Sequence, residues 1–251
     1  YQSLDEIREL LWKEKQNEAT KLANEKFMSQ PFGQQCYLPF GNILLDFPGH
    51  EKATNFKRTL DLEDAISSVL YEVDEVKFKR EVFSSEPDQA IVIRIESSKN
   101  GKLNFTAGLD SPHSNYEVSV DGNEIILKGK ANNYPKELDF IGKPYPESKL
   151  TFEARLKVIN EGGEIVQTEN SIKIENAKKA TLYLVAATSF VNYGDISGNP
   201  DERCEVYLSN LEGKSYETLK ADHISDHQKL FNRVELNLGS SEISNRPTNE
   251  R

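Results

Sequence analysis

Between about Tyr37 and Ala187 the chain consists of short β-type runs that are separated by turn residues, and no helical pattern interrupts them. Parallel pairing of consecutive strands needs crossover connections of a dozen residues or more, which the short gaps do not provide. Roughly ten strands at this spacing therefore predict a mainly β fold, in which the strands pair antiparallel as a sandwich.

Turn residues indicate where these strands end and which of them form hairpins. Gly supplies the positive φ that a tight hairpin needs, so the segments on either side of Asn100-Gly101, and those around Gly122-Asn123, are predicted to pair. Residues 132–148 contain prolines and no β pattern, and we expect a long excursion from the sandwich there. The predicted strands are 43–47, 68–73 and 76–83 as a hairpin across Asp74-Glu75, 90–96, 103–109, 116–120, 124–128, 150–159, 171–175 and 181–187.

Helical patterns lie at the two ends of the chain. From Leu4 to Met28 apolar residues recur at helical spacing, which predicts one amphipathic helix with a break near Gln16-Asn17. Ser3 and Glu6 have the spacing of a capping box at its start. The bulkiest residues of this segment, which we expect to pack rather than to bind, are Trp12 and Phe27.

The helical period returns after the β region. The acidic start Pro200-Asp201-Glu202 suits a helix dipole, and a helix is expected as far as Leu211. Gly213 breaks it, a second helix opens at Ser215, and residues 234–238 have the pattern of a final strand. The chain thus divides into a helical segment, 1–29, inserted in or packed on the sandwich, a sandwich, 30–199, and a helical linker, 200–251.

Composition narrows the classes of partner. The net charge of the chain is −10, so we do not expect a surface that binds nucleic acid or anionic membranes in general, because such surfaces carry an excess of Lys and Arg. Apolar runs such as 182–187 fall far short of the roughly 20 residues of a membrane-spanning helix. Cys36 and Cys204 are expected to be free, partly buried thiols, with a single bridge between them left open.

The run from Thr188 to Asp195, directly after the last predicted strand of the β region, is the candidate binding segment. An apolar strand that ends in hydroxyls, an amide, a carboxylate and aromatic rings is suited to a polar ligand with flat faces, such as a sugar. The alternative is that the aromatic residues cap a core and that the polar ones form an ordinary turn. The predicted substrate-binding residues are Phe190, Asn192, Tyr193 and Asp195.

Catalytic and metal-binding signatures are mostly absent from the sequence. His223 and His227 stand four residues apart on a predicted helix, but the glutamate that a zinc-protease motif needs is missing, and packing is expected instead. Serine-nucleophile and phosphate-loop spacings are not found. We therefore expect no metal site and no cofactor in this segment, and these motifs point to no catalytic residue.

Several blocks of sequence resemble the amino-terminal domain of glycoside hydrolase family 95. They are 38–50 (LPFGNILLDFPGH), 54–62 (TNFKRTLDL), 80–85 (REVFSS), 87–89 (PDQ), 186–193 (AATSFVNY), 203–205 (RCE) and the helical segment 215–234. The resemblance covers essentially the whole chain, in order. It implies a galactose mutarotase-like β-supersandwich and a helical linker, followed in the family by an (α/α)6 catalytic barrel that carries the acid and base.

Two functional hypotheses follow. By resemblance, the chain is the non-catalytic amino-terminal domain of an inverting α-L-fucosidase or α-L-galactosidase that acts on glycans, with the barrel as its missing partner. The alternative is a free-standing carbohydrate-binding β-sandwich module. The chain begins at Tyr1 and its only methionine is Met28, so we expect it to be part of a longer protein. The family analogy favours a periplasmic or extracellular location.

Overall fold

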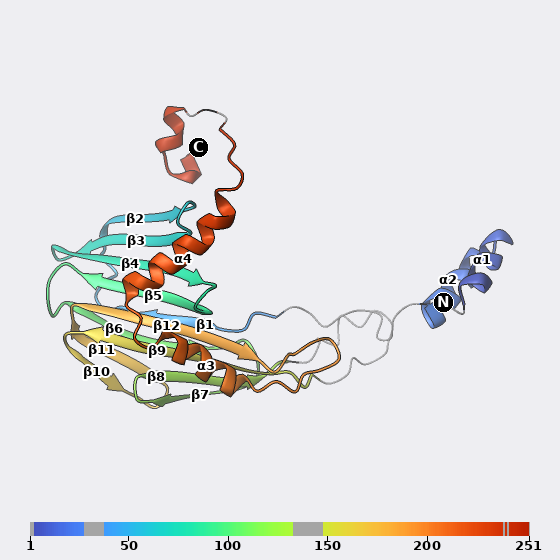
Figure 1. Cartoon of the computed structure of the whole chain (residues 1–251), viewed down its shortest axis with the longest axis horizontal. Coiled ribbons are helices and arrows are strands. Elements are labelled where there is room, and N and C mark those ends of the chain that lie inside the picture. Colours follow the sequence, from blue (N-terminus) through green and yellow to red (C-terminus); the bar gives the residue numbers. More distant parts are fainter. Residues whose placement is uncertain (1–2, 28–37, 133–147, 238, 240, 251) are drawn as a thin grey trace.

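The computed structural model describes residues 3–27, 38–132, 148–237, 239 and 241–250, and its main body is a two-sheet β-sandwich (Figure 1). In chain order its elements are α1 (Leu4–Trp12), α2 (Gln16–Leu22), the π-helical turn η1 (Ala23–Phe27), β1 (Asn42–Asp46), β2 (Thr54–Asp61), β3 (Ile66–Val73), β4 (Val76–Ser85), β5 (Ala90–Ser97), β6 (Leu103–Asp110), β7 (Asn115–Asp121), β8 (Glu124–Lys130), β9 (Thr151–Glu161), β10 (Glu164–Gln167), β11 (Ser171–Ala177), β12 (Lys179–Thr188), α3 (Pro200–Leu211), α4 (Tyr216–Phe231) and the 3₁₀ turns η3 (Glu242–Asn245) and η4 (Thr248–Glu250).

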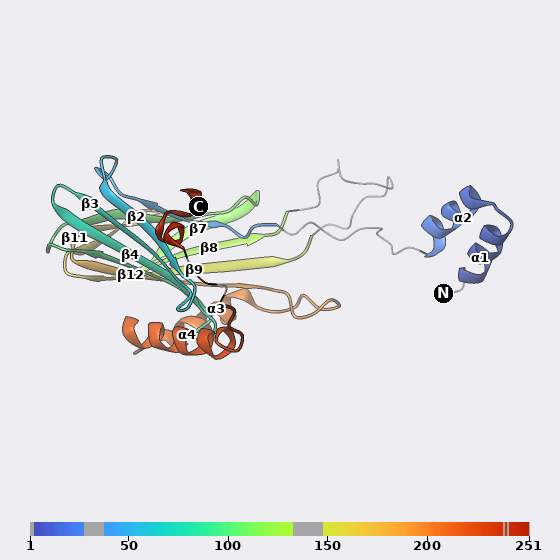
Figure 2. The same ribbon diagram turned by 90° about the horizontal axis from the view of Figure 1, so that it is seen from above.

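Two antiparallel sheets form the sandwich, as the sequence predicts. Among the described residues, the larger sheet has eight strands in the order β2-β3-β4-β5-β12-β9-β8-β7, and the smaller one has four in the order β1-β6-β11-β10. Every strand pair is antiparallel. Figure 2 shows the two layers seen from above, with α3 and α4 on the outer face of the larger sheet.

Two of the three predicted hairpins form, both with two-residue loops. β3 and β4 pair from Ser67 to the turn, and Asp74 and Glu75 adopt φ of 47° and 61° although neither is the glycine that such a turn favours. β7 and β8 pair around Gly122, whose φ is 58°. Register between strands thus enforces left-handed backbone even where the residue type does not prefer it.

The predicted hairpin between β5 and β6 is wrong, because these two strands belong to different sheets. β5 already has a neighbour on each edge, β4 and β12, and so offers no free edge to β6. Gly101 does use its positive φ of 67°, but in an arch that carries the chain from one layer to the other. Leu103 and Phe105 then point back into the core from the opposite side.

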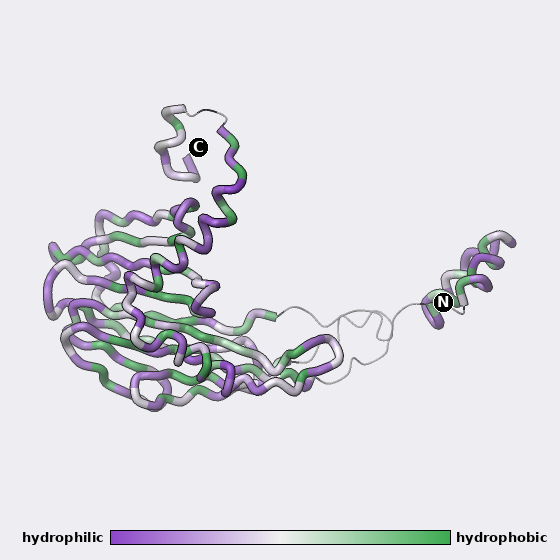
Figure 3. Tube along the Cα trace, viewed as in Figure 1, coloured by the Kyte–Doolittle hydropathy of each residue, from purple (hydrophilic) through white to green (hydrophobic). Residues whose placement is uncertain are grey.

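Apolar side chains fill two layers of core. The first lies between the sheets and includes Ile95, Phe105 and Leu156. The second lies between the outer face of the larger sheet and the carboxyl-terminal helices, and it includes Phe83, Cys204 and Leu219. Figure 3 shows apolar residues running through the strands and polar residues at the turns. The helices expected to be a linker are therefore packed firmly on the sandwich.

The strand prediction fails at three other places. β2 and β10 are strands that the alternation of polar and apolar residues does not indicate, since β2 is exposed along its whole length as an edge strand. Residues 234–237 do not form the predicted final strand; Val234 and Leu236 are exposed there. The predicted excursion 132–148 lies almost entirely outside the described residues.

The helices after the sandwich begin where the sequence predicts. Asn199 caps α3 by accepting a hydrogen bond from the Asp201 N–H, and Ser215 caps α4 by accepting one from the Thr218 N–H. Gly213, between the helices, has a φ of 75°. Among the described residues, no helix is long and apolar enough to cross a membrane.

The amino-terminal helical segment breaks after Trp12 into α1 and α2, close to the predicted break. The capping box does not form: Ser3 has helical angles, φ −93° and ψ −2°, and its side chain makes no capping hydrogen bond. Trp12 does not pack as predicted, being 80% exposed, and Phe27 is 44% exposed. Figure 1 shows α1 and α2 apart from the sandwich, and their insertion in or packing on it stays a prediction.

Candidate functional site

The predicted binding segment is the loop between β12 and α3, at one end of the sandwich (Figure 1). Its backbone closes into a tight turn, in which the N–H groups of Val191 and Asn192 donate to the Asp195 carbonyl oxygen at 3.0 Å. The Asn192 side-chain oxygen accepts from the Gly194 N–H at 2.9 Å. The polar residues therefore do form the turn that the alternative interpretation expects.

The aromatic residues of the loop do not cap a core. Phe190 is 51% exposed and Tyr193 is 102% exposed, so both rings present faces to solvent. Asp195 accepts from the Ser197 N–H at 2.8 Å, and the hydrogen bonds from Ser197 hold the pKa of Asp195 below its usual range. The loop thus carries two ring faces, an amide and an ionised carboxylate, and its binding of sugar stays a prediction.

Arg203 holds the loop in place from α3. Its guanidinium donates to the carbonyl oxygens of Thr188 at 2.7 Å and Phe190 at 2.8 Å. Gly198 allows this approach, because a Cβ at that position would lie 2.7 Å from the Arg203 side chain. Ser189, between Thr188 and Phe190, fixes the same stem of the loop to β9 by accepting from the Thr151 N–H. The exposed rings therefore stand on a rigid base.

An ionic network supports the start of α3 beneath this loop. The Glu153 carboxylate is nearly fully buried and accepts from Arg155 Nε at 2.6 Å, while Lys128 Nζ lies 3.3 Å away. Asp201, in the first turn of α3, bonds the other end of the Arg155 guanidinium. Burial alone would lower the pKa of Arg155, but the hydrogen bond and charge of Glu153 outweigh it, and the pKa is raised.

Cys204 lies beside this network and is not a reactive thiol. Its side chain is fully buried, and its Sγ contacts the Glu153 carbonyl oxygen at 3.5 Å. Burial, with the nearby charge of Glu153, raises the pKa of the Cys204 thiol to about 12. It is a free thiol, as predicted, while Cys36 lies outside the described residues.

A cavity of about 260 Å³ opens between the two sheets at the same end of the sandwich. Its walls are mostly apolar, from residues such as Ile43, Leu109 and Leu127. The polar feature at its mouth is the hydrogen bond from the Asn42 side-chain amide to the Asp110 carboxylate at 2.6 Å. Sequence alone could not place this cavity, because its walls come from strands that are far apart in the chain.

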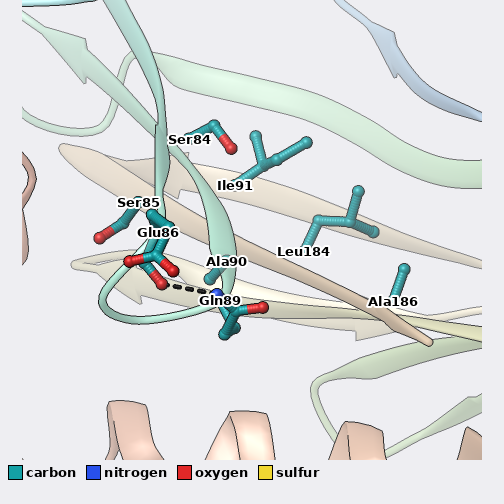
Figure 4. A pocket seen from close by; sticks show the side chains of 8 residues that line it. All are labelled: Ser84, Ser85, Glu86, Gln89, Ala90, Ile91, Leu184 and Ala186. Carbon is teal, nitrogen blue, oxygen red and sulfur yellow. Dashed lines mark hydrogen bonds between the residues drawn. The ribbon is translucent and has the colours of Figure 1, made fainter. Parts of the chain in front are cut away.

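A second hollow, of about 340 Å³, adjoins this cavity at the β4–β5 turn (Figure 4). Ile91, Leu184 and Ala186 point to one side of the sheet and line both spaces. Hydroxyl, carboxylate and amide groups lie along its rim, and the Gln89 side chain donates to the Glu86 carbonyl oxygen at 2.7 Å. A hollow with an apolar floor and polar groups along its rim is typical of a surface that binds a small ligand, not of a catalytic acid–base pair.

The histidines have packing roles. The Nε2 atoms of His223 and His227 bond carbonyl oxygens, that of Asp64 at 3.0 Å and that of Leu62 at 3.0 Å respectively. A carbonyl only accepts, so each Nε2 carries a proton and cannot bind a metal ion. Within the described residues there is also no group of three His, Cys, Asp or Glu that could hold one.

The chain is similar to parts of known glycoside hydrolases. The model of the family described as "Glycosyl hydrolase family 65, N-terminal domain" matches residues 1–193. "Alpha-L-fucosidase 2" of Arabidopsis thaliana is 34% identical over 96% of this chain and 30% of its own length. "Probable alpha-fucosidase A" of Aspergillus niger is 28% identical over 85% of this chain and 27% of its own length.

Solved structures show weaker likeness. A bacterial glucoamylase in complex with acarbose has a TM-score of 0.44 and 11% identity, over 78% of this chain and 32% of the glucoamylase chain. The chain thus spans about a third or less of the length of the proteins it matches.

Proposed function

Since the chain belongs to the family of glycosyl hydrolase family 65 N-terminal domains, we propose that it serves as the non-catalytic amino-terminal domain of an inverting α-L-fucosidase of glycoside hydrolase family 95. The observation that carries the proposal is the alignment of nearly the whole chain, 96% of it, with a plant protein named alpha-L-fucosidase 2. The alternative activity is that of an α-L-galactosidase, whose substrate is an α-L-galactoside. In either case the reacting carboxylates belong to the rest of the protein.

Within that protein, the loop from Phe190 to Asp195 is proposed to line the edge of the active site. Support comes from its exposure, since Phe190 and Tyr193 have no partner ring among the described residues, and from its anchoring by Arg203. A rigid loop costs little entropy when it contacts a sugar. Its amide and carboxylate would bond hydroxyl groups while a ring covers an apolar sugar face.

The experiment is kinetic and uses the complete enzyme. Asn192→Ala and Asp195→Ala are each expected to lower kcat/KM on an aryl α-L-fucoside about three- to tenfold, the worth of one hydrogen bond. The melting temperature should not fall. Asn100→Ala is the matched control, because Asn100 lies in an exposed turn at the opposite end of the sandwich. Unchanged kinetics in both loop variants would remove the loop from the site.

The alternative, a free-standing carbohydrate-binding module, is favoured by the same exposed ring faces. Reading the gene beyond Arg251 distinguishes the two. Several hundred further residues with a helical pattern would support the multidomain enzyme, whereas a stop codon within a few residues would leave the binding module.

A further inference from the structure

Where the larger sheet extends beyond the smaller one, its inner face is partly open: Phe47 and His50 of the β1–β2 connection pack against part of it. The smaller sheet ends at β1, and Figure 1 shows β2 and β3 lying past it. Arg58 on β2 is opposite Val69 on β3, which is opposite Arg80 on β4. Residues directly opposite one another share a face, and Val69 packs on the core between the sheets, so both arginines face inward.

Arg80 is a partly buried guanidinium with no carboxylate partner among the described residues. Its Nη2 donates to the Tyr71 hydroxyl at 2.7 Å, and its Cζ lies 3.7 Å from the centre of the Phe47 ring. Its Nε is buried and has no hydrogen-bond partner in the described part of the chain. In contrast, Arg94 and Arg155, on the same sheet, each bond two carboxylates.

The groups around Arg80 do not neutralise it. The Tyr71 hydroxyl, which accepts from Arg80, also shares a hydrogen bond with His50 Nδ1, 2.8 Å away. Burial, and then the charge of Arg80, lower the pKa of His50 below its usual value. Arg80 is thus a cation that no carboxylate of the described residues pairs with.

Arg58 adds a second cation to the same row. It lies 5.1 Å from the centre of the Phe56 ring and forms no ion pair with the described residues. Two strand spacings separate its Cα from that of Arg80, about 10 Å, which one sugar unit and its substituent can bridge. Phe56 is 53% exposed beside it. Two unpaired guanidiniums on one face contrast with the net charge of −10 of the chain.

We propose that this open face of β2, β3 and β4 binds the carboxylate of an acidic saccharide, a uronic acid unit, through Arg58 and Arg80. A guanidinium pairs with a carboxylate through two parallel hydrogen bonds, and an exposed ring such as Phe56 covers a pyranose face. The choice of a sugar rests on the proposed function; the choice of an anion rests on the two arginines. The site is separate from the loop 188–195.

The test is a titration of the chain 1–251 with trigalacturonate and with galactotriose of the same linkage, which differ in the C6 carboxylates. Trigalacturonate should bind at least about tenfold more tightly, and its affinity should fall as salt is added. Arg58→Gln should raise Kd about tenfold. Lys57→Gln is the matched control: it removes the same charge from the same strand, but Lys57 pairs opposite Leu70 and faces the other side.

Arg80→Lys keeps the charge and removes the planar fork, so it should weaken trigalacturonate binding several-fold while the melting temperature reports on folding. Three results would overturn the proposal: equal affinity for the two saccharides, no binding of either, or equal effects of Arg58→Gln and Lys57→Gln on Kd. Equally tight binding of tricarballylate, a tricarboxylate that is not a sugar, would overturn its saccharide part. Fucosidase activity on a neutral fucoside tests the proposed function separately, because that substrate has no carboxylate.

Discussion

The buried network beneath α3 makes a quantitative prediction about stability. Arg155 is the closest partner of the Glu153 carboxylate and also bonds Asp201. The Glu153 side chain is only 3% exposed, so Arg155→Met would leave a carboxylate buried with Lys128 alone, 3.3 Å away and itself 43% exposed. Breaking a buried ion pair costs about 3–5 kcal/mol, and the remaining lysine reduces this to about 2–4 kcal/mol.

The reverse expectation holds when both charges are removed. Apolar residues of similar volume often replace a buried ion pair at little cost, so Glu153→Leu with Arg155→Met should be more stable than Arg155→Met alone, by about 2 kcal/mol. Lys157→Met is the matched control. Lys157 lies on the same face of β9, and its pair with Glu124 is nearer the surface, so the change should cost about 1 kcal/mol or less.

Urea unfolding, followed by far-ultraviolet circular dichroism, gives the free energy of unfolding of five proteins: wild type, Glu153→Leu, Arg155→Met, the double variant and Lys157→Met. Strictly additive effects of the two substitutions would contradict the reasoning, because additivity means that the two side chains do not interact. So would a loss for Arg155→Met no larger than that for Lys157→Met.

Two further predictions concern α4 and a turn. Lys220 and Lys79 lower the pKa of Glu81 against its burial, so the stability from Glu81 is present above pH 4.5 and is lost as the pH falls through the lower folded pKa. The difference in melting temperature between wild type and Glu81→Gln should therefore shrink between pH 7 and about pH 3; a constant difference would contradict it. Gly163→Ala should lower the free energy of unfolding by about 3 kcal/mol or more, because φ is +66° and the new Cβ would lie 2.0 Å from a carbonyl oxygen. Gly122→Ala, at φ +58° but with open space around the Cβ, should lower it by about 1 kcal/mol in the same unfolding assay. Similar losses for the two variants would contradict the steric reason.

Local patterns were sufficient for most of the strands and for the caps of α3 and α4. Alternating apolar residues and turn signals lie within a few positions of one another, so the β3–β4 hairpin and the Asn199 cap could be predicted without knowledge of the fold. The sheet to which a strand belongs, in contrast, depends on residues far away in the sequence. The β5–β6 arch follows from the neighbours of β5, and these are decided by β12, far along the chain.

The candidate site divides in the same way. The turn at Asn192 could be predicted from residue types, whereas its anchor, Arg203, donates across 13 and 15 residues and depends on how α3 packs. Arg58 and Arg80 are 22 positions apart in the sequence and become neighbours only through the register with β3. The exposed edge strand β2 gave no alternation from which this register could be inferred.

We propose that this chain is part of a fucosidase and that it does not itself cleave the glycosidic bond. The most direct measurement is hydrolysis of an aryl α-L-fucoside by the purified chain 1–251, compared at equal concentration with the complete enzyme. We expect the complete enzyme to release fucose and the chain alone to release none. Turnover by the pure chain, or a complete enzyme that releases neither fucose nor L-galactose from the matching aryl glycosides, would contradict it.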